Sequence, residues 1–162
     1  DNLWKGAKTV DSLKTHLRDS LIIKIGGGVK SRTGNIMETG YISDKTELAD
    51  YYASADIFFY PTLADNCPLV VLEALSCGTP VVSYDTGGVS ELVAHGITGY
   101  IAKYGDTDDL VKGTLLYKHN DILRQQSSIA ARESVIRNFT ESAMINQYAA
   151  LYDELLSKQN GK

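Results

Sequence analysis

Short apolar runs alternate with amphipathic segments along most of the chain. Runs that are rich in β-branched and aromatic residues and end near Gly or Pro are predicted strands, at 21–25, about 36–42, 56–60, 80–84 and 99–102. Helical spacing of apolar residues, with Pro68 and Gly78 at helix boundaries, predicts helices at 7–20, 45–54, 68–76, 89–94, 107–118, 120–137 and 141–157. Residues 30–35 are predicted to form a polar loop.

The order of these elements indicates the fold class. Short strands that alternate with helices form βαβ units, so we expect an α/β fold with a Rossmann-like, doubly wound parallel sheet, helices on both faces and a helical C-terminus. No linker or internal repeat divides residues 1–162, which are predicted to form one domain. Such a domain normally begins with a strand, whereas this chain begins with a loop and a helix. We therefore expect that the first, central strand is missing and that the chain is a fragment.

The composition is that of an ordinary globular protein. Hydrophobic residues make up 43% and charged residues 22% of the 162 residues, so a core can form without disulfides or structural metal. The net charge of −4 argues against nucleic-acid binding. No apolar run approaches the roughly 18 residues of a transmembrane span, and the chain start has no apolar signal core. These observations exclude collagen-like, disordered, membrane-spanning and disulfide-scaffold proteins.

Charged residues and cysteines change this picture little. The net charge is +4 over residues 1–37, −10 over 38–110 and +2 over 111–162. A basic stretch beside an acidic one marks either a phosphate-facing edge or ordinary solvated surface, and both alternatives stay open. Cys67 and Cys77 form no CxxC pair and have no histidine at metal-ligand spacing. We therefore expect reduced thiols, a cytoplasmic protein and no metal site.

The strand-to-helix loop at residues 61–68 carries the richest candidate chemistry. In open α/β sheets, ligands bind beyond the C-terminal ends of the strands, where helices begin. Free backbone N–H groups and the positive dipole end of the following helix make this loop a candidate anion site. An alternative stays open, in which Asp65 or Asn66 only caps the helix. Glu73, eight positions after Asp65, would then be an ordinary solvated carboxylate.

A set of motifs in fixed order closely resembles the C-terminal domain of glycosyltransferase family 4, whose members are GT-B enzymes that use nucleotide sugars. The motifs are an Asp65–Glu73 pair, EALSCGTPVV at 73–82, GGVSE at 87–91 and GITG at 96–99. The resemblance covers residues 5–156 and is strongest over 56–101. It implies the donor-binding half of a retaining hexosyltransferase, in polysaccharide or glycoconjugate biosynthesis.

The resemblance also implies partners. The ligand is expected to be a UDP-, GDP- or ADP-sugar, with no cofactor and no metal. The acceptor is expected to bind an N-terminal domain that is missing here, so the chain alone is expected to be inactive. Any association with a membrane surface is expected only through the full-length enzyme. A stand-alone, non-catalytic nucleotide-binding module remains the alternative, and a nucleotide-sugar epimerase is a weaker one.

Site residues follow from matching positions. Lys5 and Asp65 are the candidate catalytic residues: Lys5 resembles the phosphate-binding lysine of the family, or is a solvated lysine near a terminus. Asp65, with the amides of Asn66 and Cys67, resembles the contact to the donor sugar. The diphosphate cradle is implied to be the backbone N–H groups of Leu69 and Val70.

The nucleoside end of the implied site has further members. Glu73 resembles the acid that accepts hydrogen bonds from the ribose hydroxyls, because both of its oxygens can accept. Gly26 belongs to a loop that is implied to lie near the nucleobase, and Tyr41 and Ile42 are expected to frame the base. Gly87 and Gly88 permit either a close backbone approach or only a tight turn.

Two departures from the family pattern stand out, and one element is ambiguous. Asp65 stands where most members have Glu, so the carboxylate is nearer the backbone and the pose of the sugar is in question. The arginine that usually precedes the lysine is absent from the chain. The apolar positions of the last predicted helix favour core packing, although such a helix often returns to the other domain in GT-B enzymes.

Overall fold

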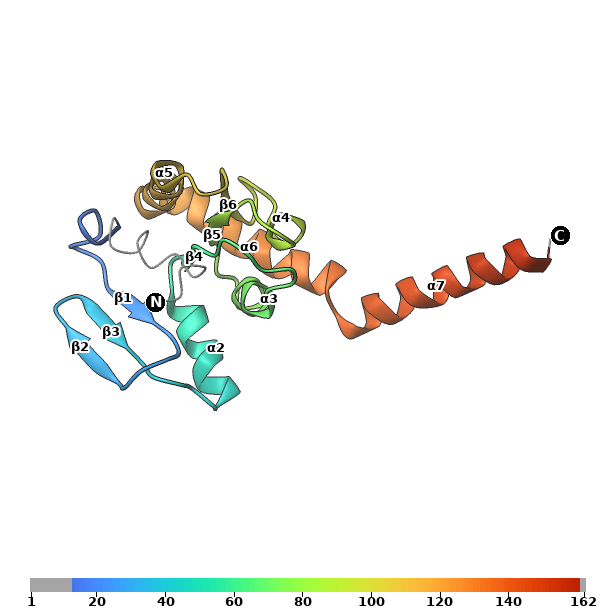
Figure 1. Ribbon diagram of the computed structural model, residues 1–162, viewed down its shortest axis with the longest axis horizontal. Helices are drawn as coiled ribbons and strands as arrows, with labels where there is room; N and C mark the ends of the chain where they lie inside the picture. Colours follow the sequence, from blue (N-terminus) through green and yellow to red (C-terminus); the bar gives the residue numbers. More distant parts are fainter. Residues whose placement is uncertain (1–12, 161–162) are drawn as a thin grey trace.

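The computed structural model describes residues 13–160, and its strands form two three-stranded sheets (Figure 1). Sheet A has the order β1-β3-β2, with β1 parallel and β2 antiparallel to β3. Sheet B has the order β4-β5-β6 and is parallel throughout. The strands are β1 Ile22–Lys24, β2 Ser31–Thr33, β3 Ile36–Glu38, β4 Phe58–Tyr60, β5 Val81–Tyr84 and β6 Gly99–Ala102.

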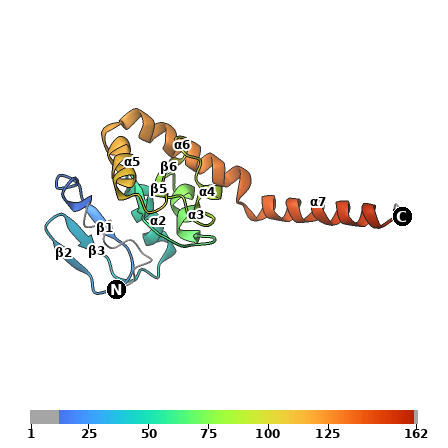
Figure 2. The ribbon, with the colours of Figure 1, turned by 45° about the horizontal axis from the view of Figure 1, so that its top comes forward.

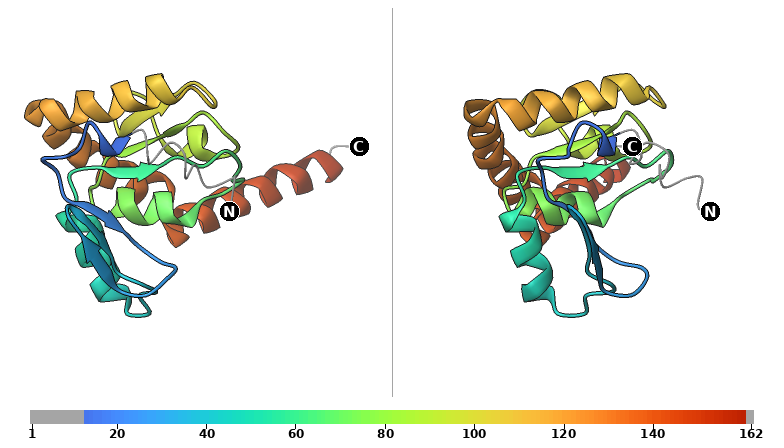
Figure 3. Two further views of the ribbon diagram at one scale, coloured as in Figure 1. Left: turned by 60° about the vertical axis from the view of Figure 1, so that its left-hand side comes forward. Right: turned by 90° about the vertical axis from the view of Figure 1, so that its left-hand side faces the viewer.

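Helices follow each strand of sheet B and complete the chain. They are α2 Lys45–Ser54, α3 Leu69–Ser76, α4 Val89–Leu92, α5 Thr107–His119, α6 Asp121–Asn138 and α7 Glu141–Asn160. Side views show α5 on one side of sheet B and α3 on the other (Figure 3). The α/β class with a parallel sheet covered by helices on both faces and a helical C-terminus is therefore confirmed.

Alternation along β5 explains the two faces of sheet B. Val81 is buried in a cluster with residues of α2, α3, α4 and α6, whereas Val82 and Tyr84 are buried in a second cluster with α5. Successive side chains of a strand point to opposite faces, and a strand covered on both faces is mostly apolar. All four residues of β5 are accordingly buried.

Sheet A differs from the predicted strands. The predicted polar loop at 30–35 is wrong in part, because Ser31–Thr33 form β2 and pair with β3. Gly34, with φ +60°, and Asn35 connect the two strands as a two-residue hairpin loop. β2 is exposed and polar, so it carries no apolar period by which it could be recognised. The predicted strand at 36–42 ends at Glu38.

Smaller differences lie at element ends. Of the predicted helix at 7–20, residues 13–14 are helical and residues 15–20 form turns and irregular backbone, while residues before 13 lie outside the described part. Turn hydrogen bonds link His16 N–H and Leu17 N–H to the carbonyl of Leu13, which is buried. The other predicted helices and strands match to within about three residues at each end, the usual uncertainty of element boundaries.

The last helix, α7, extends away from the body of the molecule (Figures 1 and 2). Its large apolar side chains are 47–60% exposed, and the expectation of core packing for this helix is wrong. They are Met144, Ile145, Tyr148, Leu151, Tyr152, Leu155 and Leu156. Within residues 13–160, no helix is both long enough and apolar enough to cross a membrane.

Candidate functional site

The loop at 61–68 leaves the C-terminal end of β4 and is fastened to the loop that follows β5. Gly88 N–H donates to the Asp65 carbonyl at 3.1 Å, and Thr86 Oγ1 donates to the Leu63 carbonyl at 3.0 Å. A Cβ atom on Gly87 would lie 1.9 Å from the Asp65 carbonyl oxygen, and one on Gly88 would lie 2.0 Å from that of Asn66. Of the two roles considered for this glycine pair, the close backbone approach is therefore the observed one.

The first turn of α3 points its amides toward the end of this loop. Pro68 is the N-cap residue, and within the part of the chain that the structure describes no side chain caps this helix end. No acidic residue lies in the first turn of α3 to compete for its positive end. The amides of Leu69 and Val70 are therefore available to an anionic ligand.

Asp65 does not cap α3. Its Oδ1 accepts from the N–H of Cys67, which precedes the helix, at 3.2 Å. Its Oδ2 accepts from Tyr60 Oη at 2.7 Å, five residues back at the end of β4. Burial and the neighbouring Asp65 carboxylate raise the pKa of Tyr60 to about 12, so its phenol remains a donor at neutral pH. The carboxylate is thus held at both oxygens and is half-buried.

Glu73 is held in a similar way from another helix. Tyr52 Oη, on α2, donates to Glu73 Oε2 at 3.2 Å. Burial, followed by the neighbouring Glu73 charge, raises the pKa of Tyr52. Tyr52 is itself 4% exposed and is anchored because its carbonyl accepts from Thr79 Oγ1 at 2.5 Å. The Glu73 side chain is exposed, so its other oxygen can accept from a ligand.

The predicted nucleobase residues lie in the loops that follow β1 and β3 of sheet A. Gly26 N–H donates to the Gly40 carbonyl at 3.0 Å, which brings Gly26 beside Tyr41 and Ile42. Gly26 has φ +86°, a conformation that favours glycine. The Tyr41 side chain is 84% exposed. These residues lie beyond the C-terminal ends of β1 and β3, and the Tyr41 ring is open to a ligand.

The structure thus brings the predicted residues into two groups. The first comprises Asp65, Asn66, Cys67, Leu69, Val70 and Glu73 on the β4–α3 segment, and the second comprises Gly26, Tyr41 and Ile42. Lys5 lies outside the described residues. Sequence analysis missed Tyr52 and Tyr60, which fix the two carboxylates. Of the two, Tyr60 was easier to identify from the sequence, because it ends the predicted strand at 56–60 and lies five residues before Asp65.

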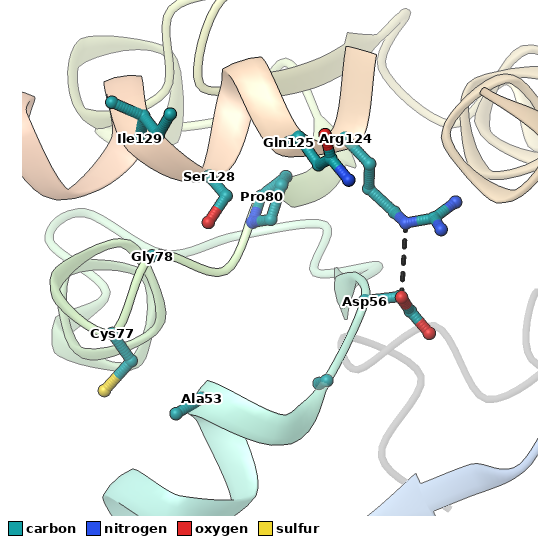
Figure 4. Close-up of a pocket in the computed structure, with 10 residues that line it drawn as sticks. Ala53, Asp56, Cys77, Gly78, Pro80, Arg124, Gln125, Ser128 and Ile129 are labelled. Atoms are coloured by element: carbon teal, nitrogen blue, oxygen red, sulfur yellow. Dashed lines mark ion pairs between the residues drawn. The ribbon is translucent and has the colours of Figure 1, made fainter. Parts of the chain in front are cut away.

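A cavity of about 500 Å³ lies elsewhere, between the ends of α2 and α3 and the flank of α6 (Figure 4). Asp56 and Pro80 line it where the chain enters β4 and β5, which is the opposite end of sheet B from the 61–68 loop. Arg124 Nε pairs with Asp56 Oδ1 across it at 3.2 Å. Because ligands of open α/β sheets bind at the other end, this cavity is not part of the site.

Among residues 13–160, no three His, Cys, Asp or Glu side chains lie close enough together to hold a metal ion. Asp65 and Glu73 each have one oxygen that accepts from a tyrosine. The arrangement offers amide donors for an anion and two fixed carboxylates for hydroxyl groups.

Relatives with named functions are similar to this chain over most of its length. The chain is 30% identical over 123 residues to N-acetyl-alpha-D-glucosaminyl L-malate synthase of Bacillus anthracis. The matched region covers 75% of this chain and 32% of that protein. It is 32% identical over 138 residues to sulfoquinovosyl transferase SQD2 of Arabidopsis thaliana, covering 80% of this chain and 27% of that protein. The chain therefore spans about a third of the length of these relatives.

Solved structures share the fold. Sucrose-phosphate synthase of Thermosynechococcus elongatus matches 96% of this chain and 43% of its own, with a TM-score of 0.80 and 23% identity. Anabaena Alr3699/HepE in complex with UDP matches 96% of this chain and 46% of its own, with a TM-score of 0.74 and 22% identity. At these identities the similarity establishes the Rossmann-like fold of GT-B proteins.

The sequence profile described as "Glycosyl transferases group 1" matches residues 32–134. The match begins in β2 and ends within α6, so it includes the whole 61–73 segment and the glycines at 87 and 88. It covers well over half of the chain. The protein belongs to the glycosyl transferases group 1 family.

Proposed function

We propose that this chain is the nucleotide-sugar-binding domain, the C-terminal half, of a retaining transferase of glycosyltransferase family 4. The observation that carries the proposal is the β4–α3 segment, where an uncapped helix N-terminus lies between two carboxylates that tyrosines hold in place. In a nucleotide sugar, the diphosphate lies between the ribose and the donor sugar. Its binding site therefore needs donors for an anion, with hydrogen-bond acceptors for hydroxyl groups on either side. That order matches the segment from Asp65 to Glu73.

The nucleotide end of the ligand is assigned to α3. The N–H groups of Leu69 and Val70 bind the diphosphate, and the helix dipole opposes its negative charge. Glu73 accepts from the ribose hydroxyls through the oxygen that Tyr52 does not occupy. Tyr41, in the loop that follows β3, is exposed and available to the base. Lys5 is assigned to the phosphates as a point charge.

The sugar end is assigned to the 61–68 loop. Asp65 and the amide of Asn66 receive the hydroxyl groups of the donor sugar, whereas the Cys67 N–H, which sequence analysis also assigned to the sugar, donates to Asp65 Oδ1. In transfer, the bond between the anomeric carbon and the diphosphate oxygen breaks, an acceptor hydroxyl oxygen bonds to that carbon and gives up its proton, and negative charge develops on the departing diphosphate. The α3 amides lie at that end of the ligand and stabilise the charge without a metal. The protein thus contributes orientation and electrostatic stabilisation.

Nucleotide binding is tested with a panel of UDP, GDP, ADP and TDP in thermal denaturation. A nucleotide at 100 times its dissociation constant should stabilise the chain by about 2.7 kcal/mol, which raises the unfolding temperature by several degrees. One base should be preferred over the others. If none of the four nucleotides changes the unfolding temperature at millimolar concentration, the chain is not the donor-binding domain.

Sugar transfer is proposed only for the whole enzyme, because this chain spans about a third of its relatives' length. Holding donor and acceptor together can lower a barrier by about 7–11 kcal/mol, which a donor site alone does not provide. The chain should therefore bind its nucleotide sugar and hydrolyse it slowly at most. Acceptor-dependent release of nucleoside diphosphate at ordinary enzymatic rates would contradict the assignment of the acceptor site to another domain.

A further inference from the structure

Contacts with residues other than Asp65 fix the position of Tyr60. It is the last residue of β4, and its carbonyl oxygen accepts from Ser83 Oγ of β5 at 2.6 Å. Its ring stacks on that of Phe58, with centroids 5.8 Å apart and planes inclined by 16°. The strand and the stacked ring together define where the phenol oxygen lies.

Asp65 is restrained at both carboxylate oxygens and at its backbone carbonyl. Tyr60 Oη holds Oδ2 at 2.7 Å, the Cys67 N–H holds Oδ1 at 3.2 Å, and Gly88 N–H holds the Asp65 carbonyl at 3.1 Å. A carboxylate offers about four acceptor positions, so about two remain for other donors. The side chain is therefore immobilised while part of its accepting capacity stays available.

We propose that Tyr60 is a positioning residue: its hydroxyl holds the Asp65 carboxylate in the orientation that receives the hydroxyl groups of a donor sugar, and so helps determine which sugar is accepted. This inference rests on the proposed function, because it places Asp65 at the sugar. A site that selects among sugars by hydrogen bonds requires acceptors fixed to about 0.5 Å. The Asp65 side chain is shorter than that of Glu. The Tyr60 hydroxyl, at the end of β4, supplies the restraint that fixes its carboxylate.

A second tyrosine–carboxylate pair provides a matched control. Tyr100 Oη donates to Asp109 Oδ1 at 2.8 Å, and Asp109 also accepts from Lys103 N–H at 2.9 Å. This pair ties β6 to the start of α5, and β6 is separated from β4 by β5 in sheet B. Removal of either phenol oxygen loses the same type of hydrogen bond. Only the loss at Tyr60 should weaken the binding of a nucleotide sugar.

The test compares Tyr60→Phe with Tyr100→Phe in the 162-residue chain. Titration calorimetry measures affinities for UDP and UDP-glucose, GDP and GDP-mannose, and ADP and ADP-glucose. Tyr60→Phe should leave the affinity for the nucleoside diphosphate within about twofold and weaken the matching nucleotide sugar about tenfold, as expected for loss of a hydrogen bond to a charged group. Tyr100→Phe should change neither affinity. Urea denaturation verifies that both variants are folded.

A double-mutant cycle separates positioning from an independent effect. Because Tyr60 is proposed to act through Asp65, adding Tyr60→Phe to Asp65→Asn should weaken nucleotide-sugar binding no further. An unchanged ratio of nucleotide-sugar to diphosphate affinity in Tyr60→Phe, or additive losses in the double variant, overturns the positioning role and leaves the proposed function intact. If the unmodified chain binds none of the three diphosphates, the proposed function fails and this inference fails with it.

Discussion

The α-carbon of Gly87 touches the backbone of Asp65 so closely that a Cβ atom there would lie 1.9 Å from the Asp65 carbonyl oxygen. Real Cβ atoms do not approach this near, so any side chain at Gly87 must displace the 61–68 loop. Gly87 also has φ +48°, which favours glycine. One glycine therefore sets the distance between the loops that follow β4 and β5, and with it the place of Asp65.

The first prediction is that Gly87→Ala destabilises the chain and weakens nucleotide binding together. Overpacking typically costs about 1–3 kcal/mol, in addition to about 1–2 kcal/mol for a left-handed conformation. Gly96→Ala is the control, because Gly96 has φ +75° and, apart from its two chain neighbours, no heavy atom of residues 13–160 lies within 4 Å of its Cβ position. Urea denaturation and calorimetry should find a larger loss of stability at Gly87, and weaker nucleotide binding there alone. Equal losses at both glycines would show that the contact with Asp65 contributes nothing.

A second prediction concerns the ribose acid. Glu73→Gln keeps the shape of the side chain but removes a charged acceptor, and hydrogen bonds to charged groups contribute about 1.5–3 kcal/mol. Nucleoside diphosphate affinity should fall roughly ten- to hundredfold, with folding intact. Tyr52→Phe, which frees Glu73 Oε2, should cause a smaller loss. Glu133→Gln, an exposed position on α6, is the control. Unchanged affinity of Glu73→Gln in a calorimetric titration would remove Glu73 from the site.

The third prediction is a pH dependence at Asp109. The Lys103 N–H and then Tyr100 Oη donate to its carboxylate and hold the pKa of Asp109 below its usual value. Because the folded pKa is lower than the unfolded value of about 3.9, the stability that Asp109 confers is present above about pH 4 and is lost as the pH falls toward the folded pKa. Asp109→Asn should therefore be less stable than the unmodified chain near neutral pH. In urea denaturation, this difference should shrink at about pH 3, and a difference independent of pH would contradict the prediction.

Elements with strong local signals were predictable from the sequence. The apolar run before Pro61 and the helix between Pro68 and Gly78 are each specified by composition and by a terminating residue, and both are confirmed. β2 was not predicted, because Ser31–Thr33 are polar and exposed. Their pairing with β3 follows from the hairpin loop and not from any apolar period in the sequence.

The candidate site was predictable where its residues are contiguous. Asp65 to Glu73 belong to one loop and one helix, so their proximity follows from the sequence. Tyr52 lies 21 positions before Glu73, and their contact depends on how α2 packs against α3. Periodicity identified α7 as amphipathic, but it does not specify what packs against the apolar positions. That is why core packing was predicted for residues that are exposed.

A fourth prediction follows from the exposure of α7. Truncation of the chain after Thr140 removes α7, whose large apolar side chains are 47–60% exposed. The free energy of unfolding should therefore fall by less than about 1 kcal/mol. Binding of an apolar fluorescent dye should decrease, because these side chains form much of the exposed apolar surface of the described chain. Thermal denaturation and dye fluorescence measure the two effects. Loss of cooperative unfolding in the shortened chain would show that α7 stabilises the body of the domain.

The last prediction is that nucleoside diphosphate binding weakens with salt and is independent of divalent metal. The proposed partners of the diphosphate are Lys5 and the amides of Leu69 and Val70 with the α3 dipole, and salt screens these electrostatic interactions. The screening length falls from about 10 Å at 0.1 M salt to about 3 Å at 1 M, so affinity should drop over this range. Calorimetric titrations with chelator and with added magnesium should agree. Asp65 and Glu73 each accept a hydrogen bond from a tyrosine, and no three metal-binding side chains meet among residues 13–160. A requirement for magnesium or manganese would mean that the diphosphate charge is neutralised by an ion and not by the α3 amides.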